Sequence, residues 1–285
     1  MVVLALTLLW TVPTVGLLVT SLRPAEDVAT TGWWTFPSDP SLTLSNYRTV
    51  LFEGGFGVGS GLLPFFINSV AISIPGTLFP LALAAMAAYA LAWLPFRGSD
   101  AVFFAIVALQ VVPLQLALVP LLQLFSGGLH IGQTTIVPPP HLAGTYWQVW
   151  LAHTMFALPL CIFLLHNFMS QLPRELMEAA IVDGASHVQI FRRVVLPLAS
   201  PALASLAIFQ FLWVWNDLLV ALTFAGGTPA VAPLTARLSQ LAGSFGGRWE
   251  LLTAGAFVSV LVPLAVFFAL QRYFVRGLLA GSVKG

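Results

Sequence analysis

The sequence predicts an all-α membrane protein in which a single domain over residues 1–285 crosses the bilayer with about six helices. Hydrophobic residues make up 59% of the chain and charged residues 7%, against roughly 45–50% and about 25% in soluble domains. Lipid can cover so much apolar surface, whereas water cannot. The apolar residues also form runs near the 20 or so residues that a helix needs to cross a hydrocarbon core of about 30 Å.

The first run, residues 2–22, contains no charged residue and ends at Arg23-Pro24. A cleaved signal peptide is the competing interpretation, but the run has neither a basic start nor an A-x-A motif before Arg23. We therefore expect a retained span, followed by an outer loop over residues 23–60. Trp33 and Trp34 in this loop are suited to the headgroup level of the membrane.

Turn-forming residues separate the later runs. The second span contains Pro75 and Pro80, whose freed backbone groups can be satisfied by neighbouring helices. Its alanine-rich stretch, residues 82–92, permits close helix contact. Three consecutive prolines at 138–140 exclude a continuous helix between the third and fourth spans. The spans after the first are expected at about 64–94, 101–125, 145–168, 198–224 and 251–274.

The distribution of Lys and Arg indicates the orientation. With both termini in the cytoplasm, seven of these residues lie on the inner side and four on the outer side, as the positive-inside rule favours. This places the loop over residues 169–198, where charge is densest, in the cytoplasm. The formal net charge is +1 and no basic run is present, so the chain is not expected to bind nucleic acid.

The cytoplasmic loop contains the segment PRELMEAAIVDGASHVQIFRRVVLPLASP, residues 173–201. Pro173 suits the first turn of a helix, and Gly184 is expected to end that helix or to let another surface approach its backbone. Such a helix can dock into a groove of a partner or merely connect two spans at the membrane surface. The residues alone favour neither. Apolar side chains recur in the segment at roughly helical spacing, at Met177, Ile181, Val188 and Phe191.

The chain resembles membrane subunits of bacterial ABC importers from the Asn46-Tyr47 loop to its last residue, and three segments are the most specific. Residues 178–185 and the later Leu196-Pro197 resemble the EAA loop of that class. Residues 213–219 are similar to the W-N-D segment of sugar-importer permeases. Residues 271–285 resemble the C-terminus of the MalG-like carbohydrate subfamily.

The resemblance implies the type I importer permease fold and alternating access, with the EAA loop forming a coupling helix on a separate ATPase. It implies a second homologous permease subunit, two ATP-binding subunits, an extracytoplasmic solute-binding protein and a place in the bacterial cytoplasmic membrane. The implied solute is an α-glucoside or another di- or oligosaccharide, and a polyol or glycerol-phosphate ester stays open. The coupling residues it implies are Glu178, Ala179, Ala180, Asp183, Gly184 and Ala185.

No cofactor is expected on this chain. A phosphate-binding P-loop needs G-x-x-x-x-G-K-S/T, but the only lysine is Lys284 and it is followed by Gly285. ATP and Mg are therefore expected on the partner ATPase. The histidines show no metal-ligand spacing, and Cys161, inside an apolar stretch, is expected to be a packing residue.

Four residues of the fifth span are candidates for the solute path or its gate. Asp217 is the only acidic residue in an expected span, and such residues are functional candidates by default. Counting about 1.5 Å per residue from Leu198 places it about 28 Å along the helix, near the outer surface, so structural capping or hydrogen bonding within the bundle is slightly favoured over a gate or solute contact. The polar side chains Asn68, Gln110, Gln115 and Gln123 are expected to form interhelical hydrogen bonds. The four candidates are Trp213, Trp215, Asn216 and Asp217.

Two other functions compete with an importer subunit. An ion-coupled secondary transporter usually has paired ionisable groups in the membrane, and the pattern offers no buried partner for Asp217. An intramembrane enzyme is less favoured, because the Gly59-Ser60-Gly61 segment lies in a loop with no histidine placed beside it.

Overall fold

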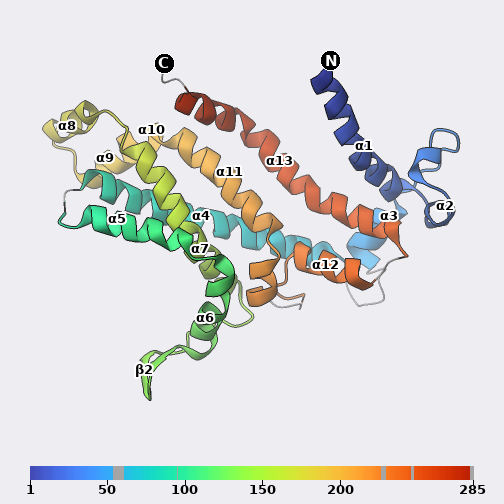
Figure 1. Ribbon diagram of the computed structural model, residues 1–285, viewed down its shortest axis with the longest axis horizontal. Coiled ribbons are helices and arrows are strands. Elements are labelled where there is room, and N and C mark those ends of the chain that lie inside the picture. The colour runs from blue at the N-terminus through green and yellow to red at the C-terminus, as the bar shows by residue number, and fades with distance from the viewer. Residues whose placement is uncertain (54–60, 95, 226–228, 245–246, 283–285) are drawn as a thin grey trace. The chain divides into compact units, whose positions relative to one another are not determined.

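The computed structural model describes residues 1–282 except 54–60, 95, 226–228 and 245–246, so the expected Gly59-Ser60-Gly61 segment lies largely outside the described residues. The described chain is almost entirely helical, which confirms the predicted all-α class (Figure 1). Four helices are long and apolar enough to cross a membrane alone, and two bent helix pairs raise this to as many as six. The four are α1 (Val2–Leu22), α4 (Leu63–Trp93), α7 (Tyr146–Met169) and α13 (Trp249–Ser282).

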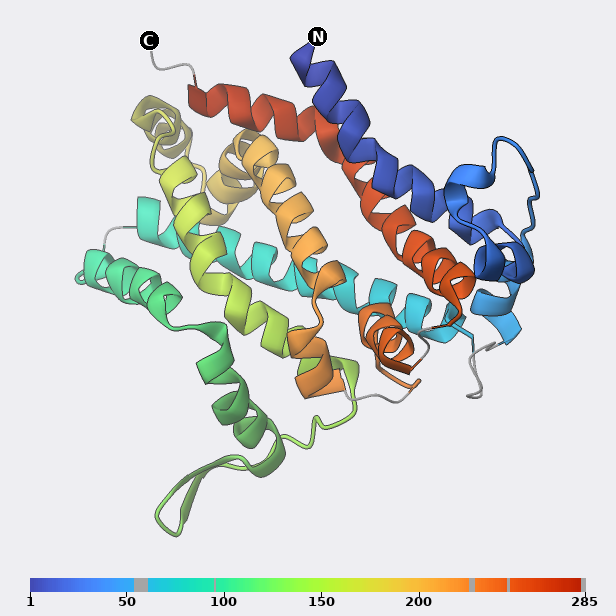
Figure 2. The same ribbon diagram turned by 45° about the vertical axis from the view of Figure 1, so that its right-hand side comes forward.

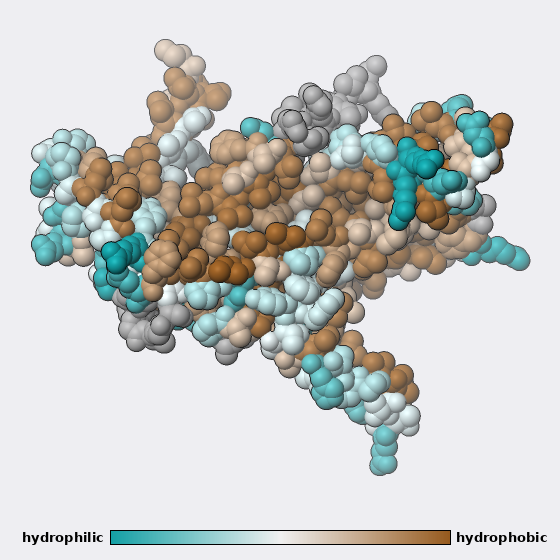
Figure 3. Space-filling model, turned by 180° about the vertical axis from the view of Figure 1, so that it is seen from behind, coloured by the Kyte–Doolittle hydropathy of each residue, from teal (hydrophilic) through white to brown (hydrophobic). Residues whose placement is uncertain are grey.

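The surface is as apolar as the composition requires. Large hydrophobic side chains are exposed along most of the long helices, and Figure 3 shows them as wide brown areas on the visible face, with hydrophilic residues gathered at projecting ends. In α1 only Gly16 and Ser21 are buried. A helix that is hydrophobic on all sides is typical of a membrane span.

Backbone contacts divide the chain into two compact units, residues 1–70 with 226–265 and residues 71–225 with 266–285. Whether the chain behaves as the single domain expected from sequence stays a prediction. The first unit contains α1, the beginning of α4 and the first part of α13. Its short elements are α2 (Ala25–Thr30), η1 (Trp33–Thr35), α3 (Ser45–Arg48), η2 (Thr49–Glu53) and α12 (Leu234–Ser244).

The loop after α1 is folded back onto the end of that helix. The buried Arg23 guanidinium donates to the carbonyl of Gly32 at 3.0 Å. The buried amide of Asn46 donates to the carbonyls of Ser21 and Arg23 at 2.9 and 2.8 Å. These bonds satisfy carbonyl groups that the end of α1 would leave without partners, so residues 23–48 form an ordered cap.

A second set of hydrogen bonds holds α12 against α4 in the same unit. The Asn68 amide donates to the carbonyls of Pro229 and Ala232 at 2.8 and 3.0 Å. The Ser69 hydroxyl accepts from the backbone N–H of Leu234, the first residue of α12, at 2.8 Å. Both of these Asn68 bonds go to the segment before α12 and not to another helix, which differs from the interhelical bond expected from sequence.

The second unit is built around α4 and α7, which share a core of small residues. Ala84, Ala88 and Ala157 are at most 1% exposed and belong to one cluster with the buried Cys161, as expected for packing residues. The remaining elements of this unit are α5 (Ser99–Ala108), η3 (Leu109–Val111), α6 (Leu114–Gly127), β1 (Leu129–Ile131), β2 (Thr134–Val137), α8 (Arg174–Val182), α9 (His187–Ile190), η4 (Phe191–Val195), α10 (Leu196–Leu198), α11 (Ser200–Asn216) and η5 (Ala221–Ala225).

The structure differs from the expected loop at residues 129–137. These residues form an antiparallel hairpin, β1–β2, in which Ile131 pairs with Thr134. Gly132 supplies the positive φ of 63° that the two-residue turn needs, a backbone conformation that glycine adopts easily. The hairpin is exposed along its length.

Two prolines inside α4 do not break the helix, because side chains from neighbouring helices replace the hydrogen bonds that they remove. Proline lacks an N–H and leaves the carbonyl four residues earlier without its partner. For Pro75 that carbonyl belongs to Ala71, which accepts from the Trp150 indole N–H of α7 at 3.0 Å. For Pro80 it belongs to Gly76, which accepts from the Gln210 amide of α11 at 3.2 Å.

Gly76 also lets α11 come close enough for this bond. A Cβ at Gly76 would lie 3.2 Å from Cγ1 of Val214, which is one helical turn after Gln210. The expectation that bundle partners satisfy the groups freed by proline is confirmed at both positions.

The bond between Gln210 and Gly76 gives a prediction. Gln210→Leu removes the donor and leaves a buried carbonyl unsatisfied, so it should lower the free energy of unfolding in detergent by about 1–3 kcal/mol. Pro80→Ala restores a backbone N–H for the same carbonyl. The double variant Pro80→Ala/Gln210→Leu should therefore recover most of the lost stability, which a double-mutant cycle measures as a coupling energy. Equal instability of the double variant and Gln210→Leu would contradict the assignment.

Candidate functional site

The predicted coupling loop begins with a short helix, α8, that ends as the sequence indicates. Gly184 adopts a left-handed conformation with φ of 79°. Its N–H donates to the carbonyl of Ile181 and the N–H of Ala185 donates to that of Ala180, both at 2.9 Å. This pair of bonds is a Schellman motif, the usual helix ending at glycine. The turn that follows presents residues 183–185 at the tip of the loop.

The apolar residues of this loop point in two directions, so the expected single apolar face is corrected. Met177 is 5% exposed and packs into the core of the second unit, and Phe191 packs against that core as well. Ile181 and Val188 are 57% and 62% exposed. One core-packed and one exposed apolar residue thus lie on each side of Gly184, so each short helical segment has an inner and an outer apolar side.

The six predicted coupling residues divide in the same way. Ala180 and Ala185 are half-buried and pack back onto the core. The other four, Glu178, Ala179, Asp183 and Gly184, are exposed. Exposed apolar side chains surround them, at Leu176, Ile181, Val182 and Val188. An exposed apolar patch rimmed by acidic groups is typical of a protein-binding surface.

Contacts that sequence reasoning missed fix the loop to the transmembrane helices. The Tyr89 hydroxyl of α4 and Nδ1 of His187 are 3.2 Å apart, and the Tyr89 ring lies 5.2 Å from that of Phe191. Ser186 and Gln189 form a capping box at the start of α9, which satisfies backbone donors there. The available signal was Tyr89 itself, a hydroxyl near the end of an expected span.

The third expected span, 101–125, is wrong as a continuous helix. The helix pair on either side of residues 112–113 is bent by 103°, and α6 turns away from α5 in both ribbon views (Figures 1 and 2). Val112 is extended, with ψ of 116°. Proline disfavours a helical conformation in the residue before it, so Pro113 places the break.

The fifth expected span, 198–224, is also interrupted. The helix bends by 72° near Ala199, and α11 ends at Asn216 because Asp217 is extended. The Asp217 carboxylate accepts the backbone N–H groups of Val220 at 3.4 Å and Ala221 at 2.9 Å. It thus caps the next turn, as aspartate commonly does at the start of a helix.

Asp217 lies beside α7. Its Oδ2 is 3.9 Å from Nε2 of His153, and both side chains are largely buried. His153 is seven residues into α7, about 10 Å from the end of that helix. Asp217 therefore has a buried ionisable neighbour, which corrects the expectation that none was available.

The other candidates for the solute path have different environments. Trp215 is 1% exposed and stacks on Phe211 with ring centroids 5.7 Å apart, so it is a core residue. The exposed Asn216 amide donates to the carbonyl of Leu212 at 2.8 Å. Trp213 is 41% exposed and lines a pocket.

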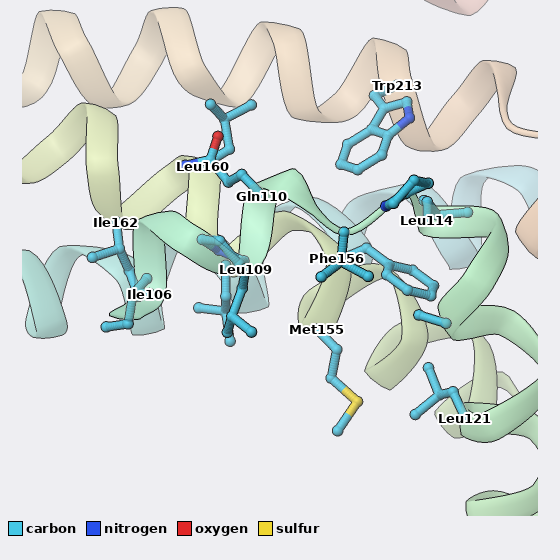
Figure 4. Close-up of a pocket in the computed structure, with 15 residues that line it drawn as sticks. Ile106, Leu109, Gln110, Leu114, Leu121, Met155, Phe156, Leu160, Ile162 and Trp213 are labelled. Atoms are coloured by element: carbon cyan, nitrogen blue, oxygen red, sulfur yellow. The ribbon is translucent and has the colours of Figure 1, made fainter. Parts of the chain in front are cut away.

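The pocket has a volume of about 740 Å³ and lies beside the break between α5 and α6. Figure 4 shows Gln110 and Leu109 from the break, Met155 and Phe156 from α7, and Trp213 from α11 around it. Its lining residues are mostly apolar, and none of those described is charged. Its size falls in the range of about 300–1,000 Å³ that is usual for small-molecule sites. Among the described residues no group of metal-ligating side chains occurs.

Comparison with known proteins gives consistent matches. Residues 79–279 match the model of the family described as binding-protein-dependent transport system inner membrane component. The chain is 51% identical to the osmoprotective compounds uptake permease protein GgtD of Synechocystis sp., over 99% of this chain and 90% of that protein. It is 54% identical to the alpha-glucoside transport system permease protein AglG of Rhizobium meliloti, over 89% of this chain and 63% of that protein.

A solved structure shares the fold. A chain of a bacterial ABC transporter involved in the import of the acidic polysaccharide alginate matches with a TM-score of 0.75 at 20% identity, over 96% of this chain and 94% of the other. The predicted importer permease fold is confirmed by this likeness.

The capping role of Asp217 is testable. Asp217→Asn keeps the shape but leaves one acceptor oxygen for two backbone donors, so the assembled protein should lose about 1 kcal/mol of stability. Solute uptake per assembled complex should stay near the wild-type value. Asp39→Asn, at an exposed position, is the matched control for stability. Normal yield and stability with lost uptake would instead show that Asp217 acts in the solute path or gate.

Proposed function

The chain belongs to the family of binding-protein-dependent transport system inner membrane components, and we propose that it passes an α-glucoside or a related di- or oligosaccharide into the cytoplasm as one half of an ATP-driven importer. A permease of a sugar or osmoprotectant importer is what the family and its relatives support. The proposal adds the solute class, the coupling residues and the orientation.

The main support for coupling to a separate ATPase is the exposed face of the loop over residues 169–198. Glu178, Ala179, Asp183 and Gly184 lie on it, and a side chain at Gly184 would meet nothing within 4 Å in this chain. Met177 anchors α8 from behind in the core. A rigidly held helix with a small-residue tip suits docking into a groove of a partner, and the half-buried Ala180 and Ala185 let it pack closely on its own core.

The proposed partners follow from this arrangement. Two ATP-binding subunits would dock on this loop and on its counterpart in a second, homologous permease, and ATP and Mg would be bound by those subunits. A solute-binding protein would deliver the sugar from the outer side. Both termini and the loop over residues 169–198 would then face the cytoplasm of a bacterial cell.

Two relatives support the solute class. One is a permease of an alpha-glucoside transport system and the other takes part in the uptake of osmoprotective compounds. A neutral, hydroxyl-rich solute is compatible with both names and with a pocket whose described lining has no charged group. A polyol is the second candidate, favoured by the osmoprotective relative alone.

The assembly can be tested directly. When this chain is expressed with a homologous permease and an ATPase from the same gene neighbourhood, we expect one complex to purify with two ATPase copies. The complex should take up sugar from the binding protein in proteoliposomes, and this chain alone should show neither ATP hydrolysis nor uptake. Uptake by this chain alone, driven by an ion gradient, would overturn the proposal.

Coupling can be tested at Gly184. Gly184→Trp adds a large ring at the docking tip, and overpacking of about 1–3 kcal/mol should weaken ATPase binding roughly 5- to 150-fold. Gly184→Asn is the control, because asparagine tolerates the left-handed conformation without much bulk. Co-purified ATPase and solute-stimulated hydrolysis are the measurements, with thermal stability as a check of the membrane fold. Wild-type coupling in Gly184→Trp would mean that the loop only connects two spans.

A further inference from the structure

The pocket beside the α5–α6 break lies near the middle of the membrane-spanning part of the second unit. Met155 and Phe156 of α7 line it, and Phe156 is ten residues from Tyr146, about 15 Å along the helix axis. Since α7 has 24 residues, about 36 Å, this is close to its midpoint. A solute that crosses the bilayer must pass this level.

Irregular backbone at this depth has a physical requirement. Within a bilayer, broken helix segments are tolerated only where they are buried in protein or line an aqueous cavity. The break over residues 109–113 lines the pocket through Leu109, Gln110 and Val112. Because α5 and η3 end there, carbonyl groups of the last turn have no partner further along a helix. The pocket is the space in which water or solute can satisfy them.

A polar side chain, Gln110, lines the same space. The exposed Gln110 amide forms no hydrogen bond within the described residues, contrary to the interhelical bond expected from sequence. Figure 4 shows both Trp213 and Gln110 among the residues that line the pocket.

We propose that this pocket is a solute-binding site of the transport path, in which Trp213 stacks on a glycosyl ring and the Gln110 amide binds its hydroxyl groups. The inference rests on the proposed function. A pyranose ring has an apolar C–H face and a rim of hydroxyl groups. An apolar cavity with an aromatic face and a few placed polar groups matches both features.

The exposed indole of Trp213 gives the first test. In proteoliposomes with the complete complex and saturating binding protein, Trp213→Leu should lower the uptake of radiolabelled trehalose or sucrose about tenfold. Trp213→Phe should keep most of the rate, because a ring remains for stacking. Phe209→Leu, an exposed aromatic residue one turn away on α11 that does not line the pocket, should have no effect.

A direct test of occupancy uses the single native cysteine. Cys161 is 1% exposed, so a new cysteine in the pocket can be labelled selectively. Gln110→Cys should react with a water-soluble maleimide, and trehalose or sucrose delivered by the binding protein should slow that reaction severalfold. Gln123→Cys, at an exposed position on α6 outside the pocket, should react at a rate that the sugar does not change.

The outcomes separate this inference from the proposed function. Unchanged uptake in Trp213→Leu, or labelling of Gln110→Cys that sugar does not slow, would overturn the binding site while ATPase co-purification leaves the importer assignment intact. A Gln110→Cys complex that resists the maleimide and cross-links to the partner permease would show that the pocket is a subunit interface. If Trp213→Leu fails to assemble, the labelling experiment decides.

Discussion

The fold depends on one constraint, which is that backbone N–H and C=O groups inside a bilayer must find partners within the protein. The constraint is most visible in α4, where Pro75 and Pro80 each free a carbonyl. Trp150 of α7 and Gln210 of α11 donate to those carbonyls. A local defect in one helix thus becomes two specific bonds to its neighbours. Those bonds hold together the helices that form the walls of the second unit.

The same constraint explains where the helices are interrupted. At Pro113 the carbonyl of Leu109 accepts the backbone N–H of Val112 at 3.2 Å, with no side-chain donor among the described residues, and the chain bends beside a cavity. At Asp217 the carboxylate takes two backbone N–H groups and begins a new turn. Residues that the bilayer would otherwise disfavour are therefore concentrated around α7, which stays continuous. The candidate solute path lies along this helix, and the coupling loop follows its end.

Much of this arrangement was predictable from local patterns. The rest could not be predicted, because it depends on contacts between residues that are far apart in the sequence. Charge-free runs locate the long helices, and Gly184 marks the end of α8, because both signals are local. Pro113 and Pro80 look alike in the sequence, yet one breaks a helix and the other does not. The carbonyl that Pro80 frees has the donor Gln210, which is 130 residues further along the chain and which no local pattern indicates. The closeness of Asp217 to His153 likewise depends on bends that a straight count cannot include.

The sparse polarity of the pocket has a kinetic consequence. A solute held by one ring face and two or three hydrogen-bonding groups would bind weakly, with a dissociation constant of about 1 mM. With an association rate constant of about 10⁶ M⁻¹s⁻¹, its residence time would be about a millisecond. A site of this kind releases its cargo faster than the slow conformational steps of a transporter proceed. High affinity for the solute is then needed only in the solute-binding protein, and a site in the membrane does not hold the solute long enough to slow transport.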